Sequence, residues 1–260
     1  DLINVQYTSG TTGFPKSYLL PQTYWLLMAR ATVAWMDHRP KRMLAQNPFH
    51  YMNCQFMLLM ALELGATLHV AARPSATKFL PWIKRHGIEW CVFPEIVLKQ
   101  PAMPDDGSTQ LKEVLLAAAS ANGQREIERR FNVYARELFG MTECGPNCFR
   151  PLPGGRRDSV GLPTFDLEAR LAEDGELLLR GPHVFAGYFR DEEATRAALS
   201  DDGWLRTGDI GRLDGEGNLY LTGRKKNLII LSSGENIMPS SIRCALAGVT
   251  INPSNAAAAI

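Results

Sequence analysis

The amino-acid sequence predicts an α/β protein, in which part of a large layered sheet-and-helix domain is followed by a small antiparallel β subdomain. In the first half, short apolar runs typical of strands alternate with segments whose apolar residues recur every three or four positions, as on one helix face. From residue 158 onward the helical spacing fades, and short runs are separated by Gly, Asp and Pro turns. We therefore expect the α/β part at 1–157 and the β subdomain at 158–223.

The chain opens with an apolar, alternating segment at 2–7 that predicts a strand. A loop of small hydroxylated residues follows, and 17–20 is expected to be a short returning strand. Pro21 then starts a helix, because proline is tolerated at a helix start. One apolar face of this helix is formed by Trp25, Met28, Ala29, Thr32, Val33 and Met36.

The rest of the first half continues the alternation of strand and helix. Gly65 is a plausible C-cap for the second helix. The segment at 123–131 carries five charged residues and predicts an exposed helix. The remaining expected strands are 42–46, 66–71 and 88–92, and the remaining expected helices are 51–64 and 78–85.

In the second half, the runs at 167–171 and 176–180 predict strands of the β subdomain. A brief helix is expected at 192–199. The segment at 214–218, with two glycines, predicts a hairpin turn.

Composition limits the class of protein. The chain has 260 residues, is 45% hydrophobic and carries a net charge of +1, which gives no electrostatic case for binding nucleic acid or an anionic membrane surface. The most apolar run, 25–36, contains Arg30 and is too short to span a membrane, so we expect no transmembrane segment. Nothing in the composition predicts an oligomeric state.

Cysteine usage indicates the compartment. The five cysteines are odd in number and contain no C-x-x-C pair, which makes a zinc site improbable. A reduced, cytoplasmic protein is the expected setting.

The first motif is Y-T-S-G-T-T-G-F-P-K at residues 7–16. Small side chains let a polyphosphate approach the backbone, where N–H groups, hydroxyls and one ammonium can surround its oxygens. A P-loop is excluded, because Gly10 stands six residues before Lys16 and Pro15 occupies a place where that motif needs glycine. GTTG alone would equally suit a glycine-rich turn whose hydroxyls cap local backbone.

Three further motifs follow in order: E-L-F-G-M-T-E at 137–143, G-W-L-R-T-G-D at 203–209 and G-R-K-K-N-L-I-I at 223–230. An aromatic ring beside glycine can lie flat on a purine. Glu143 is a hard oxygen ligand that suits Mg²⁺, although alone it would more often be a solvated carboxylate. Asp209 offers two acceptor oxygens to a diol, but it could also be a β-turn aspartate.

Together the four motifs resemble those of the adenylate-forming superfamily, which includes acyl- and aryl-CoA synthetases, peptide-synthetase adenylation domains and luciferases. The acyl-CoA synthetase branch fits best, because G-R-x-K stands where other branches have G-R-x-D. The resemblance implies a truncated chain: the second half of the large domain, its β subdomain and, at 224–260, a hinge and the truncated start of a small domain.

The resemblance also implies roles for single residues. Lys16, Thr142 and Glu143 would be catalytic, with Glu143 also binding the metal. Phe49 and His50 would line the carboxylate pocket, although His50 could instead cap the helix that follows it. The nucleotide-binding positions would be Thr8, Ser9, Gly10, Thr11, Thr12, Gly13, Lys16, Ala118, Phe139, Gly140, Met141, Thr142, Asp209 and Arg224.

Lys226 falls on the hinge position between the two domains in this resemblance. The family's adenylation lysine would lie beyond Ile260, near the end of the small domain. A chain without that lysine would be a catalytically incompetent nucleotide-binding fragment, and this alternative stays open.

The implied activity is that of an ATP-dependent carboxylic acid–CoA ligase. The expected cofactors are ATP, Mg²⁺ and coenzyme A, and the expected partners are a small-molecule carboxylic acid and CoA. Loading of a carrier protein is the alternative within the enzyme class. The resemblance suggests fatty acid metabolism as a setting, but the sequence does not identify the acid.

Overall fold

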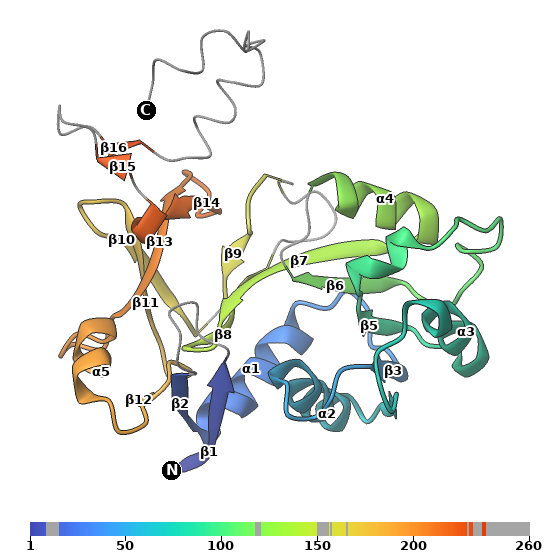
Figure 1. The fold of residues 1–260 in the computed structure, drawn as a ribbon, viewed down its shortest axis with the longest axis horizontal. Helices are drawn as coiled ribbons and strands as arrows, with labels where there is room; N and C mark the ends of the chain where they lie inside the picture. Colours follow the sequence, from blue (N-terminus) through green and yellow to red (C-terminus); the bar gives the residue numbers. More distant parts are fainter. Residues whose placement is uncertain are drawn as a thin grey trace, which may run out of the picture.

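The computed structural model describes residues 1–8, 16–117, 121–149, 156, 158–164, 166–227, 229–230 and 236–237 (Figure 1). A seven-stranded sheet lies at the centre of the first half, and a narrower antiparallel sheet stands beside it. The expected α/β class is confirmed.

The seven strands lie in the order β4-β3-β5-β6-β7-β8-β9. The first five strands are parallel to one another. β8 runs antiparallel to β7, and β9 runs antiparallel to β8. The bounds are β3 (Arg42–Ala45), β4 (Thr67–Val70), β5 (Trp90–Val92), β6 (Glu113–Ala117), β7 (Tyr134–Met141), β8 (Gly145–Phe149) and β9 (Leu162–Pro163).

Helices cover both faces of this sheet because successive strand residues point to opposite sides. On β3, Met43 belongs to the apolar cluster built with α1 (Gln22–Ala34) and α2 (Met52–Leu64). The next residue, Leu44, belongs to the cluster built with α3 (Ala76–His86) and α4 (Ala121–Phe131). The central strands β3 and β5 are therefore largely buried on both faces, as expected for a parallel sheet, whereas the edge strand β4 is partly exposed.

Two local expectations can be compared with these helices. Gly65 ends α2 in the left-handed conformation, with φ 63°, which confirms the predicted C-cap. The helix predicted at 123–131 is present, but the prediction that it is exposed is wrong for one face. Ile127 and Phe131 are fully buried against the sheet. Arg125, Glu126 and Arg129 lie on the exposed face, so the helix is amphipathic. The Arg130 side chain is instead buried in an ion pair with Asp106.

The second sheet is antiparallel, in the order β10-β11-β13-β14. Its strands are β10 (Glu168–Leu171), β11 (Glu176–Arg180), β13 (Leu205–Leu213) and β14 (Leu219–Arg224), and α5 (Glu192–Ala198) precedes β13. The hairpin turn predicted at 214–218 joins β13 to β14, where Asp214 Oδ1 accepts from the backbone N–H groups of Glu216 and Asn218.

A third, three-stranded sheet has the order β1-β2-β12 and comprises β1 (Leu2–Thr8), β2 (Lys16–Pro21) and β12 (Gly187–Tyr188). The antiparallel pairing of β1 with β2 confirms the expected returning strand. Because β12 pairs with β2, residues 187–188 lie beside the start of the chain. This pairing positions the site described below.

Beyond β14 the structure describes η2 (Lys225–Asn227) and the short pair β15 (Ile229–Ile230) and β16 (Asn236–Ile237), and η1 (Glu95–Lys99) follows β5. β9 and β12 both pair with strands that precede residue 158. The boundaries at 157/158 and 223/224 therefore stay predictions. None of the helices described is long and apolar enough to cross a membrane.

Candidate active site

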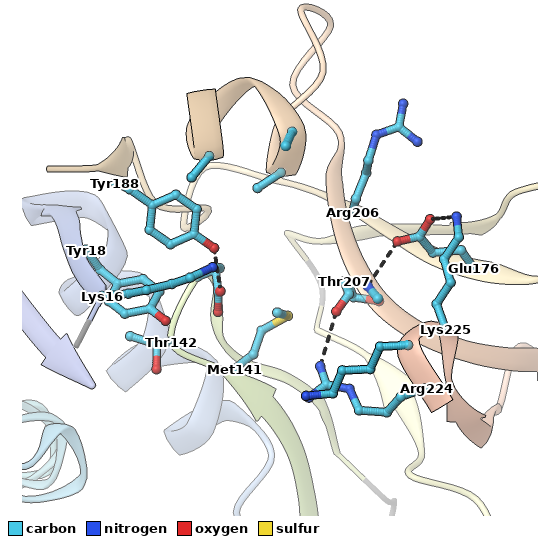
Figure 2. Close-up of a pocket in the computed structure, with 16 residues that line it drawn as sticks. Lys16, Tyr18, Met141, Thr142, Glu176, Tyr188, Arg206, Thr207, Arg224 and Lys225 are labelled. Atoms are coloured by element: carbon cyan, nitrogen blue, oxygen red, sulfur yellow. Dashed lines mark hydrogen bonds and ion pairs between the residues drawn. The ribbon is translucent and has the colours of Figure 1, made fainter. Parts of the chain in front are cut away.

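The larger of two neighbouring cavities, about 940 Å³, lies where the turn after β7 faces β12, α5, β13 and η2 (Figure 2). Among the described charged residues along its wall, five are basic and two are acidic. The charged and hydroxylated residues that line it are Lys16, Tyr18, Thr142, Glu143, Glu176, Tyr188, Arg206, Thr207, Arg224, Lys225 and Lys226. A cavity with this excess of cations suits a polyanion.

The turn after β7 is held at both of its central residues. The buried Tyr24 hydroxyl donates to the Thr142 carbonyl at 3.2 Å, and the Phe185 N–H donates to the Glu143 carbonyl at 2.6 Å. The backbone of the turn is therefore fixed, and both side chains line the cavity.

Tyr188 of β12 donates its hydroxyl to Glu143 Oε1 at 2.9 Å. Burial raises the pKa of the Tyr188 phenol, and the nearby Glu143 carboxylate raises it further, so Tyr188 stays a donor. Lys16 Nζ lies 4.6 Å from the centre of the Tyr188 ring. Lys16, Tyr188 and Glu143 thus form one connected group on the cavity wall, and Figure 2 shows Lys16 beside the Tyr188 ring.

These residues fit a Mg²⁺ ion that is held mainly by a substrate. Among the described residues, no group of three His, Cys, Asp or Glu side chains could enclose a metal ion. Mg²⁺ commonly takes one or two carboxylates and completes its shell with phosphate oxygens and water. Glu143 can supply that one carboxylate.

Asp209 and Arg224 are directly opposite each other on β13 and β14. Arg224 Nε lies 2.8 Å from Asp209 Oδ1, and Arg224 Nη2 donates to the Thr207 carbonyl at 3.3 Å. Burial raises the pKa of the Asp209 carboxyl, and the Arg224 guanidinium partly offsets this effect. The pair presents a carboxylate acceptor and a guanidinium donor side by side.

A second cavity, about 560 Å³, adjoins the first and shares Met141, Thr142 and Arg224 with it. Its walls are mainly apolar. The remaining lining residues are Met28, Met52, Asn53, Phe56, Glu137, Leu138, Phe139, Gly140, Gly145, Pro146, Val160, Asp209 and Leu221. A Cβ on Gly140 would lie 2.5 Å from the Gly145 carbonyl oxygen, so this position requires glycine.

The fold brings together most of the described residues that were singled out in the sequence. Phe139, Gly140, Met141, Thr142, Asp209 and Arg224 line the second cavity, and Lys16, Glu143 and Lys226 line the first. Ser9, Gly10, Thr11, Thr12, Gly13 and Ala118, with the side chain of Thr8, lie outside the described residues.

Two sequence candidates lie elsewhere. Phe49 and His50 are exposed in the turn before α2, and neither belongs to the described lining of the two cavities. The His50 carbonyl accepts from Gln6 Nε2 at 2.9 Å, which ties this turn to β1. Their proposed contact with the acid stays a prediction.

Three contributors were not singled out in the sequence: Tyr188, Glu176 and Lys225. Tyr188 reaches the site only through the pairing of β12 with β2, which no local pattern encodes. For Lys225 the sequence does give a weak signal, because it lies between Arg224 and Lys226, which the motif comparison named.

Comparison with known proteins gives a consistent result. The family model for AMP-binding enzymes matches residues 1–189. A sulfoacetate–CoA ligase from Cupriavidus necator is 37% identical over 93% of this chain and 51% of its own length. A 2-succinylbenzoate–CoA ligase from Listeria innocua is 31% identical over 92% of this chain and 52% of its own length.

Among solved structures, O-succinylbenzoate coenzyme A synthetase from Bacillus subtilis in complex with ATP and magnesium ion superposes with a TM-score of 0.79. The two sequences are 28% identical, and the match covers 94% of this chain and 54% of that one. The chain thus spans about half the length of the curated relatives it matches.

Proposed function

Since the chain belongs to the AMP-binding enzyme family, we propose that its polypeptide is an acid–CoA ligase. It activates a carboxylic acid with ATP as an acyl-adenylate and transfers the acyl group to the thiol of coenzyme A. The observation that carries the proposal is the convergence of Lys16, the Thr142–Glu143 turn and the Asp209–Arg224 pair on two connected cavities. These residues come from three distant parts of the sequence.

In the first step, a carboxylate oxygen of the acid attacks the α-phosphorus of ATP. The bond from phosphorus to the bridging oxygen breaks, and pyrophosphate leaves with its electrons. Lys16 lines the cavity end at which the phosphates would lie, and its charge stabilises the departing pyrophosphate. Thr142 donates its hydroxyl to the α-phosphate.

Glu143 and its donor Tyr188 serve the same step. When bound, Mg²⁺ neutralises phosphate charge. The Tyr188 hydrogen bond fixes one oxygen of Glu143 and leaves the carboxylate directed at the cavity. Positioning and charge complementarity, without a covalent enzyme intermediate, are sufficient for phosphoryl chemistry of this kind.

Asp209 and Arg224 hold the nucleoside. The ionised Asp209 accepts hydrogen bonds from the ribose hydroxyls, and Arg224 keeps that carboxylate ionised and in place. Phe139 and Gly140 border the second cavity, where a purine can lie on the ring beside bare backbone.

In the second step, the thiol sulfur of coenzyme A attacks the acyl carbon of the adenylate. The bond from that carbon to the phosphate oxygen breaks, AMP leaves, and the thiol proton passes to solvent. Arg206 of β13 and Lys226 of η2 also line the first cavity, and their charges suit an approaching phosphorylated thiol.

The test is acid-dependent pyrophosphate release by the complete polypeptide, measured with ATP, Mg²⁺ and a panel of carboxylic acids. We expect release with at least one acid, followed by AMP formation and loss of free CoA thiol. Failure of every acid, together with failure to bind ATP, would refute the proposal. Pyrophosphate release without CoA consumption would instead favour a carrier-protein acceptor.

We also propose a reduced, cytoplasmic setting. Cys54, Cys91, Cys144 and Cys148 are free and buried. Burial raises the pKa of the Cys91 and Cys148 thiols, so both stay protonated and unreactive. Fractionation of cells that express the protein tests this location directly.

A further inference from the structure

Glu176, near the start of β11, has a carboxylate that is almost completely buried and contacts two different parts of the site. Its residue is 3% exposed. Oε1 accepts from the Gly208 backbone N–H at 3.0 Å, and Oε2 lies 2.9 Å from Lys225 Nζ. Figure 2 shows the Glu176 carboxylate between Thr207 of β13 and Lys225.

The first contact fixes the backbone that carries Asp209. Gly208 has φ 71°, a left-handed conformation that suits glycine. The ladder between β11 and β13 is irregular between Glu176 and Leu178, so side chains replace regular strand pairing there. Thr207 Oγ1 donates to the Leu177 carbonyl at 2.8 Å and accepts from the Asp209 N–H at 3.0 Å.

The second contact fixes the backbone that carries Arg224. Lys225 directly follows Arg224, and its ammonium also lies 2.6 Å from Asp174 Oδ2. Asp174 Oδ1 accepts from the Glu176 N–H at 3.1 Å, so the two carboxylates are themselves connected. Lys225 is held from two sides, although about half of its side chain is exposed.

We propose that Glu176 is a positioning residue for nucleotide binding: one buried carboxylate holds both strands that carry the Asp209–Arg224 pair and connects that pair to η2. This inference rests on the proposed function, because it takes the pair to be the ribose site. Glu176 lines the first cavity, but its two oxygens are engaged by the Gly208 N–H and by Lys225, so its effect on the nucleotide is indirect.

The chemistry of the two contacts allows them to be separated. Glutamine at position 176 keeps an oxygen for the Gly208 N–H but removes the charge that holds Lys225. Methionine at position 225 leaves Glu176 unchanged and removes the ammonium, whose side chain is about half exposed. Both changes remove the ion pair between Glu176 and Lys225, and Lys225→Met also removes the contact with Asp174.

The experiment titrates ATP into the complete polypeptide and its Glu176→Gln, Lys225→Met and doubly substituted forms, and compares their dissociation constants and melting temperatures. We expect each single change to weaken ATP binding about fivefold, while the Km for the acid changes little. The double variant should bind ATP no more weakly than Lys225→Met alone, because the contact between Glu176 and Lys225 cannot be lost twice. Glu168→Gln is the matched control, since Glu168 forms an exposed ion pair with Arg180 in the same sheet.

The outcomes separate the inference from the proposed function. If the unchanged protein does not bind ATP, the proposed function fails. If it binds ATP and both single variants bind equally well, only the role of Glu176 is refuted. The role would also be refuted if the losses of ATP affinity multiplied in the double variant, since the two residues would then act independently. Parallel losses of ATP affinity, acid affinity and melting temperature would refute it too, since they indicate general damage to the fold. If Glu176→Gln does not fold, Lys225→Met alone decides.

Discussion

Replacing Tyr188 with phenylalanine removes one oxygen atom and isolates the hydrogen bond that orients Glu143. The bond is 2.9 Å long and joins the phenol of Tyr188, a buried residue, to the Glu143 carboxylate. A hydrogen bond to a charged group contributes about 1.5–3 kcal/mol. Because Glu143 is partly exposed, we take the lower end, which corresponds to roughly a tenfold loss of rate.

The assay is the rate of acid-dependent pyrophosphate release as a function of Mg²⁺ concentration. We expect Tyr188→Phe to be about tenfold slower and to need more Mg²⁺ for half-maximal rate, since Glu143 is no longer fixed. The phenyl ring remains beside Lys16, so that contact is preserved.

Tyr220→Phe is the matched control for this experiment. Tyr220 also donates its hydroxyl to a carboxylate, that of Asp214 at 3.0 Å, but it lines neither cavity in the described part of the chain. A rate for Tyr188→Phe within about twofold of the unchanged enzyme, or an equal loss in both variants, would refute the assigned role of this contact.

The remaining predictions concern the site itself. Lys16→Ala and Glu143→Ala should each lower adenylate formation by on the order of a hundredfold or more while the melting temperature stays close to that of the unchanged protein, and normal rates in both would remove their assigned roles. Burial raises the pKa of Asp209, so its ionisation costs stability: this contribution is favourable below the ordinary aspartate value and is lost as pH rises through the raised pKa. Asp209→Asn should therefore melt at an equal or higher temperature at neutral pH yet lose ATP affinity, and a calorimetric scan beside an ATP titration checks both. In the unchanged protein, ATP affinity should fall on acidification at a higher pH than an ordinary aspartate would give. Gly140→Ala should lower the free energy of unfolding by about 1–3 kcal/mol in a denaturant titration, because the added Cβ meets the Gly145 carbonyl oxygen; an unchanged midpoint would show that the turn relaxes.

Much of this site could be predicted from sequence because its groups occur in short motifs. Thr142 and Glu143 are adjacent, and Asp209 ends a seven-residue motif, so chemistry and local spacing point to them together. The alternation of apolar segments likewise predicts the central sheet, since strands buried on both faces read as continuous apolar runs.

The parts that were missed depend on contacts distant in sequence. Tyr188 reaches Glu143 because β12 pairs with β2, a strand that begins at the last residue of the first motif but precedes Tyr188 by about 170 residues. Glu176 appears in the sequence as an ordinary polar residue at a strand edge. Only the irregular pairing of β11 with β13 turns its carboxylate toward Gly208 and Lys225.

The central claim is that one nucleotide occupies both cavities, and a crystal structure with a non-hydrolysable ATP analogue and Mg²⁺ tests it most directly. The account predicts ribose hydroxyls at the Asp209 carboxylate, phosphates beside Lys16, and the metal ion on Glu143. A nucleotide bound elsewhere, in contact with none of these three side chains, would contradict it.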